Sequence, residues 1–166
     1  GWTWRQSASP RAAFADIPAM AGLLAEAHAR SIYARTTTLD IPHVKTLLLQ
    51  AVQADGGAGL GGTLARVAEH DGRVSGLFVA VRERVHDLCT SDTLRARDLF
   101  YVNQGNPRDG VRLLDAFLDW ARHDPQVIEV IASFTDTVSD SARVARLYER
   151  RGFSRHGLIY RKELTP

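Results

Sequence analysis

The residues from Leu99 to Ala121 join an apolar run, a short polar loop and an amphipathic segment, in the order LFYVNQGNPRDGVRLLDAFLDWA. The pattern predicts a strand, a turn and the start of a helix. A helix start presents backbone N–H groups and a partial positive charge, and both attract phosphate. The same pattern also fits an ordinary capped connection between a strand and a helix, so two interpretations stand side by side.

Four residues in or next to the loop favour anion binding. Gly105 and Gly110 carry no Cβ, so the backbone at these positions can approach a ligand closely. Arg108 and Arg112 can add charge-assisted hydrogen bonds to phosphate oxygens. These features make the loop the strongest candidate for a binding site in the chain.

Other residues weaken that interpretation or compete with it. Pro107 has no N–H to donate, and the Asp109 carboxylate can cap the helix in place of an anion. A second glycine-rich stretch, Asp55–Gly62, also resembles a phosphate loop. A strand is expected after it rather than a helix, so we interpret that stretch as a linker.

The bulk composition excludes several classes of protein. The chain has 166 residues, 45% of them hydrophobic and 24% charged, with a formal net charge of +2, so neither nucleic-acid binding nor disorder is indicated. Its single cysteine, Cys89, can build neither an internal disulfide nor a cysteine zinc site, which fits a reducing cytoplasm. The six histidines lack metal-ligand spacing, and we expect no metal, signal peptide or membrane span.

Hydrophobic spacing and turn residues predict the elements that must position the loop. Asp16 is expected to cap the first helix, and the pair Asp71-Gly72 to close a hairpin. The expected order is strand 2–7, helix 17–33, helix 41–54, a hairpin of two strands within 63–85, strand 99–102, helix 109–124, strand 126–135, helix 139–152 capped by Ser139 or Asp140, and strand 153–164. This order, β-α-α-β-β-β-α-β-α-β, predicts one α/β domain with a mixed sheet over residues 1–166.

The order of elements and two stretches of residues resemble the GNAT superfamily of acyl-CoA-dependent N-acyltransferases. Near the C-terminus, ARLYERRGFSRHGLIYRKEL resembles the closing motif of that family, with Leu147-Tyr148 followed by Gly152-Phe153. The stretches AHARSIYA and YERRGF also resemble GNAT-like proteins of phages and prophages. The resemblance to the superfamily covers the whole chain in the order of elements, and Leu99 to Leu164 at the level of residues.

The loop matches the pyrophosphate-binding turn of the family only in part. Leu113 and Leu114 fit its paired leucines, and Gly110 fits the last small residue of the turn. Without a gap, Gly105 and Arg108 stand where the family has a Gln or Arg and a glycine. With a gap, Arg108 becomes the turn arginine, and the sequence leaves both alignments open.

The resemblance implies that acetyl-CoA is the acyl donor and gives a role to each matching position. The backbone of the strand would pair with the pantetheine amides, and the turn would hold the pyrophosphate. The residues concerned are Tyr101, Val102, Asn103, Gly105, Arg108, Asp109, Gly110, Val111 and Arg112. By the same resemblance, Ser31 and Tyr33 would help to form the wall of the acceptor site.

Tyr148 is the implied proton donor to the departing thiolate. A phenol with an ordinary pKa near 10 is protonated at neutral pH and can supply that proton. A tyrosine packed against a sheet is the competing interpretation. Six residues are candidates for the base that deprotonates the amine, namely Glu69, His70, Glu83, His86, Asp98 and Glu129, and we select Glu83.

The sequence therefore predicts a single-domain GNAT fold that transfers an acetyl group to a primary amine on a small molecule or peptide. The amine would attack the thioester directly in a ternary complex. The irregular turn supports an alternative, a CoA-binding or non-catalytic module that acts through partners. A homodimer is one of the assemblies open to either.

Overall fold

The computed structural model describes residues 9–134 and 141–164. The chain divides into two compact units, the N-terminal unit Gly1–Ser133 and the C-terminal unit Phe134–Pro166. The predicted strand 2–7 and the proposed caps Ser139 and Asp140 lie outside the described residues, and a single domain over residues 1–166 stays a prediction.

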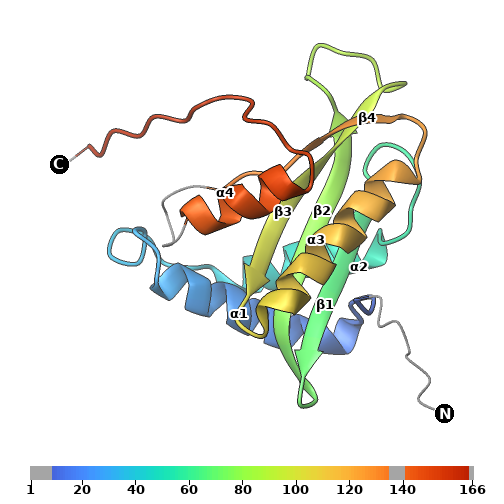
Figure 1. Ribbon diagram of the computed structural model, residues 1–166. Helices are drawn as coiled ribbons and strands as arrows, with labels where there is room; N and C mark the ends of the chain where they lie inside the picture. The colour runs from blue at the N-terminus through green and yellow to red at the C-terminus, as the bar shows by residue number, and fades with distance from the viewer. Residues whose placement is uncertain (1–8, 135–140, 165–166) are drawn as a thin grey trace. The chain divides into compact units, whose positions relative to one another are not determined.

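One mixed sheet forms the centre of the N-terminal unit (Figure 1). The strands lie in chain order, with the first two pairs antiparallel and the last pair parallel. They are β1 (Thr63–His70), β2 (Arg73–Arg84), β3 (Leu94–Asn103) and β4 (Val127–Ile131). The predicted hairpin is confirmed, because positive φ angles at Asp71 (50°) and Gly72 (74°) form the tight turn between β1 and β2.

Helices cover both faces of this sheet. The helices α1 (Ile17–Ala29) and α2 (Ile41–Gln53) pack on one face, and α3 (Pro107–Arg122) packs on the other (Figure 1). Met20 and Leu48 are fully buried in the core on the first face, and the rings of Phe117 and Phe78 stack 4.7 Å apart under α3. No helix in the described ranges is long and apolar enough to cross a membrane.

The first helix differs from its prediction at both ends. Asp16 stands at the predicted N-cap of α1, but its carboxylate accepts a hydrogen bond of 2.8 Å from the N–H of Ala13. It therefore caps the short 3₁₀ turn η1 (Phe14–Asp16) that precedes α1. The helix ends at Ala29 rather than at Tyr33, and turns follow it.

The third strand is longer than predicted, since it begins at Leu94 and not at Leu99. The sequence from Leu94 to Arg97 does not form an apolar run, because Arg95 and Arg97 alternate with Leu94 and Ala96. The two apolar side chains are fully buried, and both arginines are paired with a carboxylate on β2. Strand alternation is present, but the charged residues conceal it.

The C-terminal unit contains α4 (Ser141–Arg150). The predicted stop is confirmed, because Gly152 has a φ of +85° and its N–H donates to the carbonyl of Glu149 at 3.0 Å. The predicted strand over 153–164 is wrong, since these described residues form no strand. The alternation of Leu158 and Tyr160 suits a strand, but a strand needs neighbouring strands to be stable, and both side chains are exposed.

Candidate functional site

The turn between β3 and α3 is held by its own side chains. Asn106 is the N-cap of α3, and its side-chain oxygen accepts from the N–H of Arg108 at 2.9 Å. Asn103 accepts from the N–H of Gly105 at 3.3 Å and donates to the carbonyl of Asn106 at 3.0 Å. The N–H of Asp109 donates to that same carbonyl at 2.9 Å. Amides that an anion would use therefore already have partners within the turn.

Packing within the protein explains both glycines of the turn. A Cβ on Gly105 would lie 2.7 Å from the hydroxyl oxygen of Ser75. A Cβ on Gly110 would lie 2.9 Å from the side-chain nitrogen of Asn103 and 3.2 Å from the hydroxyl of Tyr101. The absent side chains make room for neighbouring protein atoms, which the sequence alone does not distinguish from room for a ligand.

Tyr101 fixes the start of α3 on the sheet. Its hydroxyl donates to the carbonyl of Gly110 at 2.6 Å, and its ring lies 4.8 Å from that of Phe78. Burial, followed by the nearby Asp115 carboxylate, raises the pKa of Tyr101 to about 12. The phenol therefore stays protonated at neutral pH and holds the turn in place.

The turn presents two arginines of different character. Arg108 is exposed at the start of α3. Arg112 lies one turn later and forms an ion pair of 3.4 Å with Asp109, whose side chain is 16% exposed. Half-buried Val111 lies between them on the helix. The positive charge available to a ligand is thus greatest at Arg108.

The edge of β3 leads directly into this turn. β4 pairs with β3 only from Leu94 to Arg97, whereas β2 pairs along the full length of β3. Within the part of the chain that the structure describes, no strand pairs with the β4-side edge of residues 98–103. This edge includes Tyr101, Val102 and Asn103, the positions predicted to pair with pantetheine.

A buried carboxylate lies where β3 and β4 diverge. Asp98 is 8% exposed and accepts hydrogen bonds from the N–H and hydroxyl of Ser133, at 3.1 and 3.4 Å. Burial raises the pKa of Asp98 above its ordinary value, although the hydrogen bonds oppose that shift. The register shifts beside it, since Val79 faces Phe100 and Ala80 faces Asp98, which leaves Leu99 as a bulge.

Glu83, the predicted base, is held between two arginines on β3. Its Oε1 accepts from Nε of Arg97 at 2.6 Å and from Nε of Arg95 at 2.8 Å. Burial raises the pKa of Glu83, but the hydrogen bonds and charges of the two arginines outweigh it and leave the pKa below its ordinary value. A carboxylate stabilised in its ionised form is a weak proton acceptor.

The predicted acceptor-wall residues lie in the turns after α1. The hydroxyl of Ser31 donates to the carbonyl of His28 at 2.7 Å and accepts from the N–H of Tyr33 at 3.2 Å. Tyr33 is 39% exposed. Ser31 therefore shapes the end of the helix, and Tyr33 offers a partly exposed ring.

Tyr148 lies in an aromatic cluster of the C-terminal unit. Its ring centroid lies 5.6 Å from that of Phe134 and 5.2 Å from that of Phe153. The N–H of Phe153 donates to the carbonyl of Tyr148 at 3.1 Å, and Tyr148 is 4% exposed. Within the LYERRGF stretch, the tyrosine and the phenylalanine therefore pack against each other.

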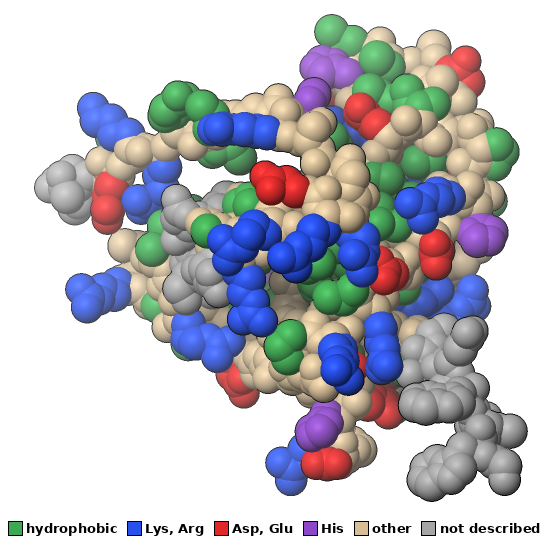
Figure 2. Space-filling model, viewed as in Figure 1, with side chains coloured by type: hydrophobic (Ala, Val, Ile, Leu, Met, Phe, Trp, Pro, Cys, Tyr) green, Lys and Arg blue, Asp and Glu red, His purple; other side chains and the backbone are tan. Residues whose placement is uncertain are grey.

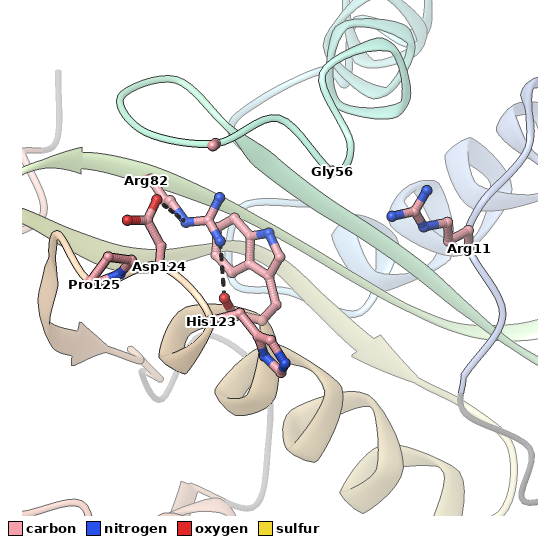
Figure 3. Close-up of a pocket in the computed structure, with 8 residues that line it drawn as sticks. Arg11, Gly56, Arg82, His123, Asp124 and Pro125 are labelled. Atoms are coloured by element: carbon pink, nitrogen blue, oxygen red, sulfur yellow. Dashed lines mark hydrogen bonds and ion pairs between the residues drawn. The ribbon is translucent and has the colours of Figure 1, made fainter.

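A pocket of about 330 Å³ lies beside the C-terminal end of α3, whereas the turn lies at its N-terminal end. Figure 3 shows Arg82, His123 and Asp124 among the residues that line the pocket. Arg82 is 5% exposed there and donates to the carbonyls of Gly57 and Trp120 at 2.7 and 2.9 Å. Its Nε lies 3.4 Å from Asp124, and its guanidinium lies 4.1 Å from the Trp120 ring centre. These contacts hold the end of β2 against α3 and against the glycine-rich stretch Asp55–Gly62.

Sequence reasoning did not identify Arg82 or Asp124. The signal was present, because Arg82 continues the alternation of Phe78 and Ala80, which places it on a buried face. No group of three or more potential metal ligands occurs among the described residues.

Comparison with protein-family models gives no match, and comparison with curated proteins gives none either. Solved structures do match. A ribosomal-protein-alanine N-acetyltransferase from Brucella melitensis is 22% identical over 89% of this chain and 85% of its own, with a TM-score of 0.66. Glucosamine-6-phosphate N-acetyltransferase from Arabidopsis thaliana is 13% identical, covers 94% and 97%, and has a TM-score of 0.64. An aminoglycoside 6′-N-acetyltransferase from Acinetobacter haemolyticus is 11% identical, covers 95% and 98%, and has a TM-score of 0.60.

The chain therefore has the α/β fold of the GNAT acetyltransferases, as the resemblance predicts. At these identities the similarity establishes the fold and leaves the activity to be argued from the site.

Proposed function

We propose that this chain transfers an acyl group, in the simplest case acetyl, from acetyl-CoA to a primary amine. The observation that carries the proposal is the β4-side edge of β3 beyond Arg97, with which no strand of the described residues pairs and which runs from the divergence at Asp98 into the turn before α3. An extended pantetheine can pair with that edge like an added strand, and the pyrophosphate then meets the helix start. The similar structures are named as acetyltransferases of amines on a protein alanine, a sugar phosphate and an aminoglycoside, which supports an amine acceptor.

In this proposal the amine nitrogen attacks the thioester carbonyl, the new C–N bond forms and the C–S bond breaks. Tyr148 gives its phenolic proton to the thiolate, and a base takes the proton that the amine loses. Holding the amine against the thioester supplies much of the acceleration.

The proposed donor site comprises Tyr101, Val102 and Asn103 for pantetheine and Gly105, Arg108, Asp109, Gly110, Val111 and Arg112 for the pyrophosphate. Ser31 and Tyr33 stay proposed acceptor contacts. Membership of a phage or prophage branch and a homodimeric state also stay predictions.

Two carboxylates compete for the role of base. Glu83 remains the choice from sequence, but its arginine partners favour the ionised form and weaken it as a proton acceptor. Asp98 lies at the point where β3 and β4 separate, and burial favours its protonated form. The raised pKa makes Asp98 the better matched proton acceptor.

The occupied amides of the turn favour the second candidate function, a CoA-binding or non-catalytic module. Titration calorimetry with acetyl-CoA, followed by release of free CoA thiol across a panel of amines, separates the two. Binding with turnover supports the enzyme, and binding without turnover supports the module. No binding at millimolar acetyl-CoA excludes the enzyme and the CoA-binding module, and leaves only a non-catalytic module that acts through partners.

A matched pair of variants tests the place of binding. Arg108→Ser should weaken acetyl-CoA binding about tenfold, roughly 1.4 kcal/mol, because it removes a charged contact to phosphate. Arg122→Ser removes an exposed arginine at the other end of α3 and should leave binding unchanged. Equal effects of the two variants would contradict a pyrophosphate site at the turn.

A further inference from the structure

The positive charge of the chain is concentrated near its C-terminus. Residues 141–164 contain seven arginines and lysines and two carboxylates, a net charge of +5, although the whole chain carries only +2. The rest of the molecule is therefore slightly acidic, and the whole-chain charge conceals a strongly basic segment.

Three of these arginines form a row on α4. Arg143, Arg146 and Arg150 follow one another at intervals of three and four residues, which places them on one face of the helix. All three are exposed, and none forms an ion pair with a carboxylate in the described ranges. Figure 2 shows basic side chains gathered along α4. Like charges at this spacing destabilise a helix, so an anion laid along the row would relieve their repulsion.

The chemistry of the row favours phosphates over other anions. A guanidinium presents a planar fork of donors that fits phosphate oxygens in pairs. The segment after α4 adds Tyr160, which is 88% exposed, and the basic residues Arg155 and Lys162. An exposed aromatic ring beside several cations is the combination on which unpaired bases stack while the cations follow the backbone.

A membrane surface fits the helix less well. A helix that lies on a bilayer inserts an apolar face beside its basic one. The apolar side chains of α4 do not offer such a face, because Tyr148 is buried and Val144 and Leu147 are half-buried.

We propose that α4 and the segment after it bind single-stranded nucleic acid, with Arg143, Arg146 and Arg150 on successive phosphates and Tyr160 against a base. This inference stands independently of acyl transfer, since it requires neither acetyl-CoA nor turnover.

The test is fluorescence anisotropy of the full chain with a labelled oligothymidylate and a labelled oligouridylate, in the absence of acetyl-CoA. Three phosphate contacts predict a slope of about −2 for log K against log salt, at roughly 0.7 per contact. A flat dependence on salt would overturn the proposal.

Arg146→Glu is the decisive variant. The new carboxylate lies three residues from Arg143 and four from Arg150, so it should stabilise α4 and raise the melting temperature slightly. The same variant should weaken oligonucleotide binding by about tenfold and reduce the magnitude of the salt slope by about one or more. Lys45→Glu, on an exposed position of α2, changes the net charge equally and should leave binding unchanged.

Three results would contradict binding of single-stranded nucleic acid to the arginine row. Equal weakening by Arg146→Glu and Lys45→Glu would overturn the proposal in favour of nonspecific attraction. Binding to vesicles of anionic lipid with no binding to either oligonucleotide would assign the row to a membrane. Displacement of the oligonucleotide by stoichiometric CoA would assign the row to the acyl donor.

Discussion

The side-chain oxygen of Asn106 accepts a hydrogen bond of 2.9 Å from the backbone N–H of Arg108, so α3 caps itself at the place where a pyrophosphate would bind. A bound phosphate must displace this cap or bind beside it. We therefore expect Asn106 to control the affinity of the turn for an anion, although the position carries no charge and no family motif marks it.

The cap can be tested by two substitutions with opposite effects. Asn106→Gly frees the Arg108 amide at a cost of a few tenths of a kcal/mol in helix stability, and it should tighten CoA binding about threefold. Asn106→Asp caps the helix equally well but adds a negative charge, and it should weaken binding about fivefold, roughly 1 kcal/mol. Calorimetry with CoA measures both. If neither variant changes the affinity, the turn amides are not the phosphate donors.

Tyr148→Phe removes only the hydroxyl and keeps the ring contacts with Phe134 and Phe153. If the phenol protonates the thiolate, turnover should fall at least about tenfold, roughly 1.4 kcal/mol, with little change in acetyl-CoA affinity. Phe153→Leu is the packing control and should lower stability more than Tyr148→Phe does. An unchanged rate in Tyr148→Phe would remove the tyrosine from the mechanism.

Asp98→Asn should separate the effect of the Asp98 charge from that of its hydrogen bonds with Ser133. Burial raises the pKa of Asp98, so the folded protein binds a proton that the unfolded chain has already released. Stability therefore falls as the pH rises from the ordinary Asp pKa, about 3.9, through the raised folded value. Asp98→Asn should melt at a higher temperature than the wild type at neutral pH, and the difference should vanish in acid.

The same variant tests the base. If Asp98 accepts the amine proton, Asp98→Asn should lower turnover by about a hundredfold and remove the acidic limb of the pH–rate profile. Glu83→Gln should then keep that limb, and the reverse result would restore Glu83 as the base. Asp87→Asn, on an exposed loop, is the control for both measurements.

Arg82→Met should be the most destabilising of these changes. It removes hydrogen bonds to two carbonyls and leaves the buried Asp124 without its cation, at a cost of about 3 to 5 kcal/mol. Arg84→Met, two residues later on the same strand, is exposed and should change stability by less than about 0.5 kcal/mol. Denaturant unfolding gives both values. Similar losses of stability in the two variants would show that Arg82 does not hold β2 against α3.

The parts of the fold that were predicted from sequence depend on local patterns. The Asp71-Gly72 turn and the apolar stripe of α3 each require only neighbouring residues, and both agree with the structure. The first half of β3 was missed because its arginines are neutralised by Glu83, a partner twelve and fourteen residues away. The strand expected over 153–164 was wrong because alternation predicts a strand without supplying its neighbour.

The candidate site was also predicted from the sequence only in part. The residue types of the loop predicted an anion-binding turn, and the structure places Arg108 in the first turn of α3, which begins two residues earlier than predicted. The occupation of the amides by Asn103 and Asn106 depends on side-chain torsions, which no spacing rule reveals. Arg82 lies near the end of β2, and Asp124 lies in the loop after α3. The two residues meet only because the fold brings that loop against the end of β2.

The short pairing of β3 with β4 has a consequence for the protein as well as for a ligand. Beyond Arg97, the backbone of β3 has a neighbouring strand on the β2 side alone within the described residues. An acyl donor laid along that edge would complete the sheet and become part of its architecture. Amide exchange in residues 98–103 should then slow on binding, and the melting temperature should rise with donor concentration by mass action.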